Sequence, residues 1–167
     1  MIRVLPLLAA LGLACAAHRA ETPQPPQLAG VPLAVTVHAL DGSEVRLEGA
    51  GQVRVVDVFA SWCDPCRAQL PALARLAEVH AGALSVVAIS VDEDRAALDR
   101  FLAQVPVAFP VLWDHGGAAL VPRLQIQRLP TTLVVDRAGV IRFVHLGYDA
   151  RSDGKLERDV ERLMAER

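Results

Sequence analysis

The apolar and polar positions along the chain alternate in one stretch and run together in others, and both patterns predict strands. Residues 31–49, VPLAVTVHALDGSEVRLEG, alternate on either side of Asp41-Gly42-Ser43, as expected for a β-hairpin. Residues 52–60, QVRVVDVFA, and 83–91, ALSVVAISV, are almost continuously apolar and β-branched, which is typical of strands covered on both faces. We therefore expect these two segments at the buried centre of a sheet.

Helical spacing follows each of the two buried strands. From Pro65 to about His80, leucines and alanines recur on one face, and Pro71 is expected to kink this helix or adjust its first turns. Residues 92–104, DEDRAALDRFLAQ, begin with acidic residues that favour a helix N-terminus and continue amphipathically. The first buried strand, the first helix and the second buried strand predict a right-handed βαβ unit.

The last third of the chain predicts a short insert and a second hairpin. Residues 109–114 fit a short strand or extended segment, and 116–126 fit a short helix broken at Pro122. The remaining elements are two strands joined by Arg137-Ala138-Gly139 and an amphipathic C-terminal helix, at 131–136, 139–147 and 153–167. Alternating β and α units followed by an antiparallel pair indicate an α/β fold with a mixed sheet and helices on both faces.

The N-terminal residues have the pattern of a secretory signal. An early arginine precedes an apolar run from Val4 to Ala17, which is shorter than the ~20 residues that a membrane span needs. Two alternatives remain open: the A-x-A site at Ala14 and Ala16 is cleaved, or Cys15 is the lipid-bearing cysteine of a bacterial lipoprotein. The expected organisation is a signal, a Pro-rich linker and one domain, at 1–17, 18–30 and 31–167. We expect the domain in the periplasm or cell envelope.

Length and charge narrow the choice of partners. The 167 residues suit one domain with a full core, and a net charge of -2 with a pI near 6.2 gives no field that attracts nucleic acid or an anionic membrane. We therefore expect no nucleic acid, contact with a membrane only through a lipid on Cys15, and a monomer.

The candidate chemistry lies in residues 60–71, ASWCDPCRAQLP, just after a buried strand. The three-residue spacing puts the sulfurs of Cys63 and Cys66 on one face of a helical first turn, within disulfide reach. Unpaired N–H groups and the helix dipole at this place stabilise an anion and lower the pKa of the Cys63 thiol. We expect an exposed Cys63 to attack a disulfide of a partner, and a shielded Cys66 to attack the resulting mixed disulfide.

Two other uses of a cysteine pair fit the sequence less well. A structural zinc site needs about four ligands, and the chain has neither a second cysteine pair nor clustered histidines. A structural disulfide that closes so small a loop would remove little entropy from the unfolded chain. We therefore interpret the pair as a redox-active dithiol and expect no metal and no cofactor.

The segment FASWCDPCRAQLP resembles the active-site segment of thioredoxin-like proteins, most of all the TlpA/ResA-type envelope thiol-disulfide oxidoreductases. The resemblance extends through VVAISVDED, FPVLWD, LPTTLVVDRAGVI and HLGY. It implies a thioredoxin-like mixed sheet with an N-terminal β-hairpin and a central insert. It also implies that Trp62 is the aromatic residue before the nucleophile Cys63, and that Cys66 is the resolving cysteine.

The resemblance further implies a client-binding surface around the dithiol. Pro130 in RLPTT corresponds to the family's cis-proline, which faces the two cysteines. The backbone of Leu129 and Thr131 beside it would then pair with an extended client segment. Trp62 and Pro65 complete the expected binding residues.

Asp57 is the candidate proton acceptor. It interrupts an apolar strand six residues before Cys63, at the place of thioredoxin's buried aspartate, and burial would raise the pKa of its carboxyl. Many TlpA-type relatives have a residue there that does not ionise, and several carry a glutamate where this chain has Gln69. The lysine that thioredoxins pair with their aspartate is replaced by Ala88. We therefore expect Asp57 alone to take the proton of Cys66, unless it points to solvent.

The expected function is reduction of protein disulfides outside the cytoplasm, for example in cytochrome c maturation, with electrons supplied by a membrane donor. Asp64 beside Cys63 opposes a thiolate, which favours a reductant over an oxidant. Two alternatives remain. A peroxiredoxin-like peroxidase usually needs Thr or Ser where Ala60 stands, and a copper-binding module usually spaces its cysteines by three residues and adds a histidine.

Overall fold

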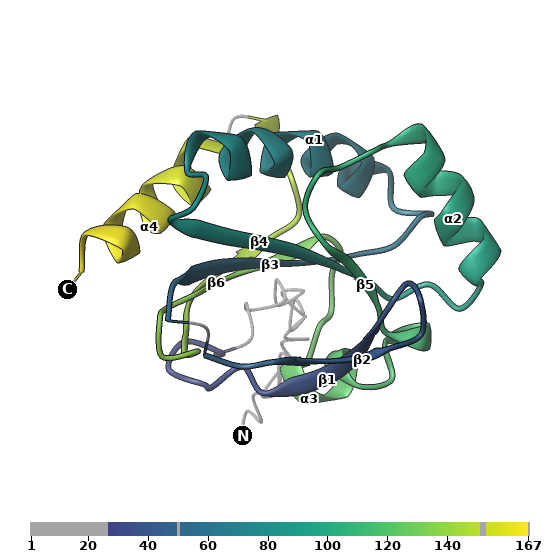
Figure 1. The fold of residues 1–167 in the computed structure, drawn as a ribbon, viewed down its shortest axis with the longest axis horizontal. Helices are drawn as coiled ribbons and strands as arrows, with labels where there is room; N and C mark the ends of the chain where they lie inside the picture. The colour runs from purple at the N-terminus through teal and green to yellow at the C-terminus, as the bar shows by residue number, and fades with distance from the viewer. Residues whose placement is uncertain (1–26, 50, 151–152, 167) are drawn as a thin grey trace, which may run out of the picture.

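A computed structural model describes residues 27–49, 51–150 and 153–166, and Figure 1 shows one sheet with helices on both faces. The seven strands pair in the order β2-β1-β5-β4-β3-β6-β7. The strands are β1 Val35–Ala39, β2 Glu44–Leu47, β3 Val53–Phe59, β4 Leu84–Ser90, β5 Val111–Trp113, β6 Thr131–Val135 and β7 Ile141–Leu146. The helices are α1 Asp64–Val79, α2 Arg95–Gln104, the 3-10 turn η1 His115–Gly117, α3 Leu120–Leu124 and α4 Asp153–Ala165.

The strand pairing confirms the predicted mixed sheet. β3 and β4 are parallel and are connected by α1, while β6 and β7 form the second antiparallel hairpin. The N-terminal hairpin of β1 and β2 joins the sheet through β5, which lies between β1 and β4. The central insert therefore supplies the strand that connects the hairpin to the parallel core.

Two hydrophobic clusters lie on the two faces of the sheet. One contains Val55 and Phe59 of β3 together with Leu70 and Leu73 of α1, and the other contains Val56 of β3 with residues of α3 and the N-terminal hairpin. Figure 1 shows α1 and α4 over one face and α3 on the opposite side. Since side chains alternate along a strand, Asp57 shares the face of Val55 and Phe59 and points toward α1.

The break in the insert lies at a different residue from the predicted one. Pro122 is the third residue of α3, a position whose N–H has no acceptor inside the helix, so proline is tolerated there. The chain instead turns at Gly116 and Gly117, whose φ angles are 59° and 72°. The prediction of a helix broken at Pro122 is therefore wrong.

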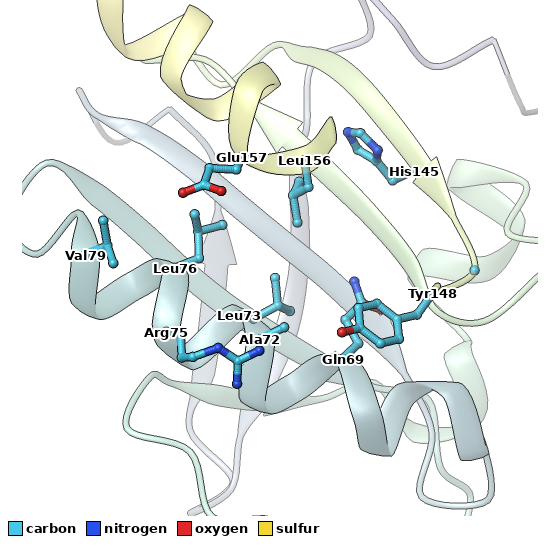
Figure 2. Close-up of a pocket in the computed structure, with 11 residues that line it drawn as sticks. Gln69, Ala72, Leu73, Arg75, Leu76, Val79, His145, Tyr148, Leu156 and Glu157 are labelled. Atoms are coloured by element: carbon cyan, nitrogen blue, oxygen red, sulfur yellow. The ribbon is translucent and has the colours of Figure 1, made fainter. Parts of the chain in front are cut away.

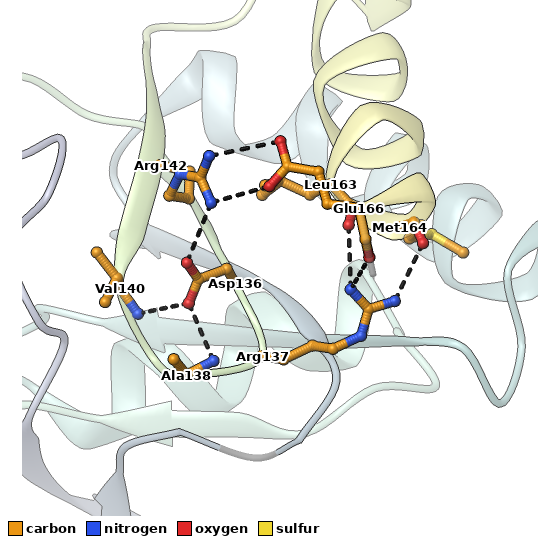
Figure 3. A network of polar contacts seen from close by, with 8 residues as sticks. All are labelled: Asp136, Arg137, Ala138, Val140, Arg142, Leu163, Met164 and Glu166. Atoms are coloured by element: carbon orange, nitrogen blue, oxygen red, sulfur yellow. Dashed lines mark hydrogen bonds and ion pairs between the residues drawn. The ribbon is translucent and has the colours of Figure 1, made fainter.

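The C-terminal helix is tied to the turn between β6 and β7, as Figure 3 shows. The Arg137 guanidinium donates to the main-chain oxygens of Leu163, Met164 and Glu166, at 3.2, 3.0 and 2.6 Å. A cation at the last carbonyls of a helix complements the helix dipole. Arg142 of β7 bridges the carboxylates of Asp136 and Glu166, so the hairpin and α4 form one packed unit.

The predicted signal and most of the linker, including Cys15, lie in residues 1–26, outside the described residues. Leu28, at the end of the predicted linker, is buried in the cluster beneath the sheet, and Gly30 donates a main-chain hydrogen bond to Ile141. Among the described residues, none of the helices combines the length and apolar character of a membrane span.

Candidate active site

Cys63 and Cys66 form a disulfide at the N-terminus of α1, with their Cα atoms 5.3 Å apart. Cys63 is the N-cap residue in an extended conformation, and Asp64, Pro65 and Cys66 follow in the first turn. Cys63 makes no side-chain capping hydrogen bond, and the N–H groups of Cys66 and Arg67 donate to its main-chain oxygen, so the helix dipole is what acts on its side chain. The reduced Cys63 would therefore lie where an anion is stabilised.

The two cysteines differ less in exposure than the sequence predicts. Cys66 is fully buried, as expected, but only 6% of Cys63 is exposed. The prediction of an exposed Cys63 is wrong because this residue packs in the hydrophobic cluster between β3 and α1. Cys63 still lines an open groove.

The groove above Cys63 has a volume of about 930 Å³. Trp62, 71% exposed, and Pro65 lie along it beside the disulfide, and Leu129 lies along it from the loop before β6. The Leu129–Pro130 peptide is cis, as the resemblance implies. Three of the five predicted binding residues are thus brought together around Cys63.

Thr131 does not belong to this surface. It is fully buried as the first residue of β6 and pairs with Val58 of β3 and Leu146 of β7. Its hydroxyl donates to the Arg128 main-chain oxygen at 2.6 Å. The prediction that its backbone is available to a client is therefore wrong, because both neighbouring places are taken by strands. Leu129 remains the residue with backbone beside the groove.

Asp57 is fully buried and does not point to solvent. Its Oδ1 accepts a hydrogen bond from the Thr132 hydroxyl at 2.8 Å, and its Oδ2 has no hydrogen-bond partner. Burial raises the pKa of Asp57 to about 7, against the hydrogen bond from Thr132, which lowers it. A carboxyl with this pKa both takes and gives protons near neutral pH.

The surroundings of Asp57 contain no compensating cation on the neighbouring strands. Ala88 of β4 lies directly opposite Asp57, and Thr132 of β6 lies opposite on the other side. Gln69 of α1 reaches the same place, and its Nε2 donates to the Thr132 hydroxyl at 2.6 Å. The sequence did not predict a role for Thr132, because Thr132 and Asp57 are 75 residues apart in the chain. The only local signal was the pair of threonines after Pro130.

Asp92, the other residue that the sequence analysis missed, holds the loop before the disulfide. It is 2% exposed, and its carboxylate accepts from the Ser61 N–H at 2.9 Å and from the hydroxyls of Ser61 and Ser90 at 2.6 and 2.7 Å. Asp94 is the N-cap of α2 and accepts from the Ala96 N–H, which confirms the acidic helix N-terminus predicted for residues 92–104. The sequence signal for Asp92 was its position directly after a buried strand, where α/β folds place functional residues.

The charge around the groove is mainly negative. Four acidic residues and one arginine line it: Asp64, Asp92, Glu93, Asp94 and Arg128. Negative charge near Cys63 opposes its thiolate and offsets part of the effect of the helix N-terminus. The one group with metal-ligand spacing in the described residues, His80, Glu157 and Glu161, includes neither cysteine.

A dithiol at a helix N-terminus, beside a cis-proline on a mixed sheet, defines a thioredoxin-like thiol-disulfide oxidoreductase, and comparisons with known proteins agree. Thioredoxin-like protein YneN from Bacillus subtilis is 28% identical over 130 residues, 75% of each chain. Thiol-disulfide oxidoreductase ResA from Oceanobacillus iheyensis is 32% identical over 112 residues, 65% of this chain and 57% of ResA.

A solved structure from Chlorobium tepidum, described as a thiol:disulfide interchange protein DsbE, superposes with a TM-score of 0.77 at 28% identity. The match covers 82% of this chain and 98% of that one. The sequence pattern of the Redoxin family matches residues 29–162, and the chain belongs to this family. Its enzyme class is that of the ResA and DsbE thiol-disulfide oxidoreductases.

Proposed function

We propose that this enzyme reduces disulfides of proteins outside the cytoplasm. The observation that carries the proposal is that Cys63, disulfide-bonded to Cys66, lines the same groove as Leu129, whose peptide bond to Pro130 is cis. An extended client segment fits this groove, with its main chain beside Leu129 and its cysteine over Cys63. The exposed Trp62 offers an apolar face to the same segment.

The reaction starts from the reduced enzyme. The Cys63 thiolate attacks one sulfur of the client disulfide, which forms a mixed disulfide and releases the second client sulfur as a thiolate. Oδ2 of Asp57 takes the proton of the Cys66 thiol, and the Cys66 thiolate then attacks the Cys63 sulfur. The client leaves as a dithiol, and the enzyme keeps the Cys63–Cys66 disulfide that the structure contains. One client thiolate takes the proton that Asp57 received from Cys66 and the other takes a proton from solvent, so two electrons and two protons have passed to the client.

The direction of exchange follows from charge. Strong oxidants of this kind stabilise the reduced form as a thiolate, which makes reduction of their disulfide favourable. Here the four acidic residues of the groove oppose the thiolate, and Arg128 is the single cation that lines it. This balance supports a low reduction potential and therefore a reductant.

The signal pattern at residues 1–17 supports a place in the periplasm or cell envelope. A reductant in an oxidising compartment has to be re-reduced, so we propose a membrane electron donor as one partner. Envelope proteins with cysteines, such as apocytochrome c, are the proposed clients, and a lipid on Cys15 is the proposed route to the membrane.

The reduction potential tests the direction. The purified domain is equilibrated in thiol–disulfide buffers, and the fraction of free Cys63 is measured by alkylation. We expect a potential near thioredoxin's about -270 mV, whereas a value near about -120 mV would identify an oxidant. Cys63→Ser should lose all disulfide reduction, and Cys66→Ser should stop at the mixed disulfide with a client peptide.

A further inference from the structure

Three buried polar side chains form a hydrogen-bonded network between α1 and the sheet. Asp57 and Thr132 are fully buried, and Gln69 is 4% exposed. The Gln69 Nε2 lies 2.6 Å from the Thr132 Oγ1, which lies 2.8 Å from the Asp57 Oδ1. These hydrogen bonds therefore link α1, which carries Cys66, to β3 through β6.

The direction of these hydrogen bonds follows from the chemistry of the groups. An amide nitrogen only donates, so the Thr132 oxygen accepts from Gln69. The single hydroxyl hydrogen of Thr132 is then directed to Oδ1 of Asp57. Oδ1 accepts this hydrogen whether Asp57 is charged or neutral. The proton of the neutral acid must therefore lie on Oδ2, the oxygen without a partner.

We infer that Thr132, oriented by Gln69, is a positioning residue that leaves Oδ2 as the atom of Asp57 that exchanges the proton. The inference rests on the proposed function, because it deepens the role of Asp57 in the resolving step. The inference also gives a role to Gln69, although its amide does not titrate. By donating to the Thr132 hydroxyl, Gln69 fixes the direction of the hydrogen bond from Thr132 to Asp57.

The other titratable groups around Asp57 are few. β4 presents Ala88 opposite it, and Cys66 of α1 titrates only when the disulfide is reduced. From β7 and α4 come His145 and Asp159, 3.1 Å apart. His145 pairs with Thr132 in the β6–β7 register.

Figure 2 shows Gln69 on α1, next to Tyr148. Gln69 lines one end of a cavity of about 360 Å³, which is also lined by Tyr148, His145 and Leu156. Burial lowers the pKa of His145, so this neighbour adds little positive charge at neutral pH. Thr132 is therefore the polar group that acts on Asp57 most directly.

The test measures the pKa of Asp57 in the oxidised protein by NMR of its side-chain carboxyl carbon, with Asp57→Asn to assign the signal. Thr132→Val removes the hydroxyl and keeps the shape, so we expect the pKa to rise by at least about one unit. Thr132→Ser should restore the wild-type value. Thr131→Val, one residue away, is the matched control, because the Thr131 hydroxyl donates to the Arg128 main-chain oxygen, and it should leave the pKa of Asp57 unchanged.

Gln69→Leu provides a second variant in case Thr132→Val does not fold. Without the amide donor, the Thr132 hydroxyl can turn and accept a hydrogen from neutral Asp57, which stabilises the neutral form. The pKa should therefore rise, by less than in Thr132→Val. The pH profile of mixed-disulfide resolution should move to higher pH by the same amount in each variant.

An Asp57 pKa that is the same in Thr132→Val, Gln69→Leu and wild type would overturn the inference. That result would leave disulfide reduction by the wild-type protein intact, and so would not touch the proposed function. Failure of the wild-type protein to reduce any disulfide, with the pKa shifts as expected, would overturn the proposed function instead.

Discussion

Asp57 and Asp92 are two aspartates buried near the same disulfide, and they differ in how many donors surround them. The carboxylate of Asp57 accepts one hydrogen bond, from Thr132, and leaves Oδ2 without a partner. The carboxylate of Asp92 accepts hydrogen bonds from a main-chain N–H and two hydroxyls, which together engage both of its oxygens. The comparison teaches that burial alone does not give an acid its role, because the donors around it decide whether it exchanges a proton or holds a loop.

The largest effect that the comparison predicts is a dependence of stability on pH through Asp57. The pKa of Asp57 is about 7 in the folded protein, against an ordinary value of 3.8, so the folded state binds the proton more tightly. The stabilisation is complete below pH 3.8 and is lost as the pH rises through 7. At about 1.36 kcal/mol per pKa unit, the loss is about 4 kcal/mol.

Denaturation of the oxidised protein from pH 4 to 8.5 measures this loss, with Asp57→Asn as the control. The free energy of unfolding of wild type should fall relative to that of Asp57→Asn as the pH rises. Parallel curves for the two proteins would contradict a raised pKa and make Asp57 a structural group like Asp92.

The second effect is the stability lost when Asp92 is removed. Asp92→Ala leaves the Ser61 N–H and the hydroxyls of Ser61 and Ser90 without their acceptor, and unsatisfied buried groups cost about 1–3 kcal/mol each. We expect a loss of about 3 kcal/mol in the free energy of unfolding, because the loop relaxes and water reaches part of it. Chemical denaturation at one pH measures it.

The smallest effect comes from the nearby Asp94, which is exposed and caps α2 through the Ala96 N–H. Asp94→Ala should cost only about 1 kcal/mol, the usual value of a helix cap. The two variants change acids two residues apart in the same DED run. Equal losses in both would show that the hydrogen bonds of Asp92 add nothing beyond those of a surface cap.

Periodicity and motif spacing predict the strands and helices and the place of the two cysteines at a helix N-terminus, because these features depend on residues that are close in sequence. The alternation around Asp41-Gly42-Ser43 predicts the first hairpin, and the apolar run broken by a single acid places Asp57 inside the sheet. The position of Cys66 in the first turn of α1 follows from the strand–helix junction.

The remaining features depend on contacts between distant segments, which a single sequence does not show. Thr132 and Asp92 gain their roles from partners 75 and 31 residues away. The burial of Cys63 and the enclosure of Thr131 between two strands depend on how loops and strands assemble. The effect of Pro122 was also not predictable, although it is local. A proline in the first turn does not break a helix, and the residue at which α3 begins was not known from the sequence.

The hydrogen bonds from Arg137 to the last carbonyls of α4 couple the local unfolding of two elements. Because the guanidinium joins the β6–β7 turn to the end of α4, fraying of that helix and opening of the hairpin should occur as one cooperative unit. β6 also carries Thr132 and follows the cis peptide, so this unit includes one side of the redox site. Slow amide hydrogen exchange in β6 would then depend on the side chain of Arg137, which lies beyond the end of β6 that is far from the cis peptide.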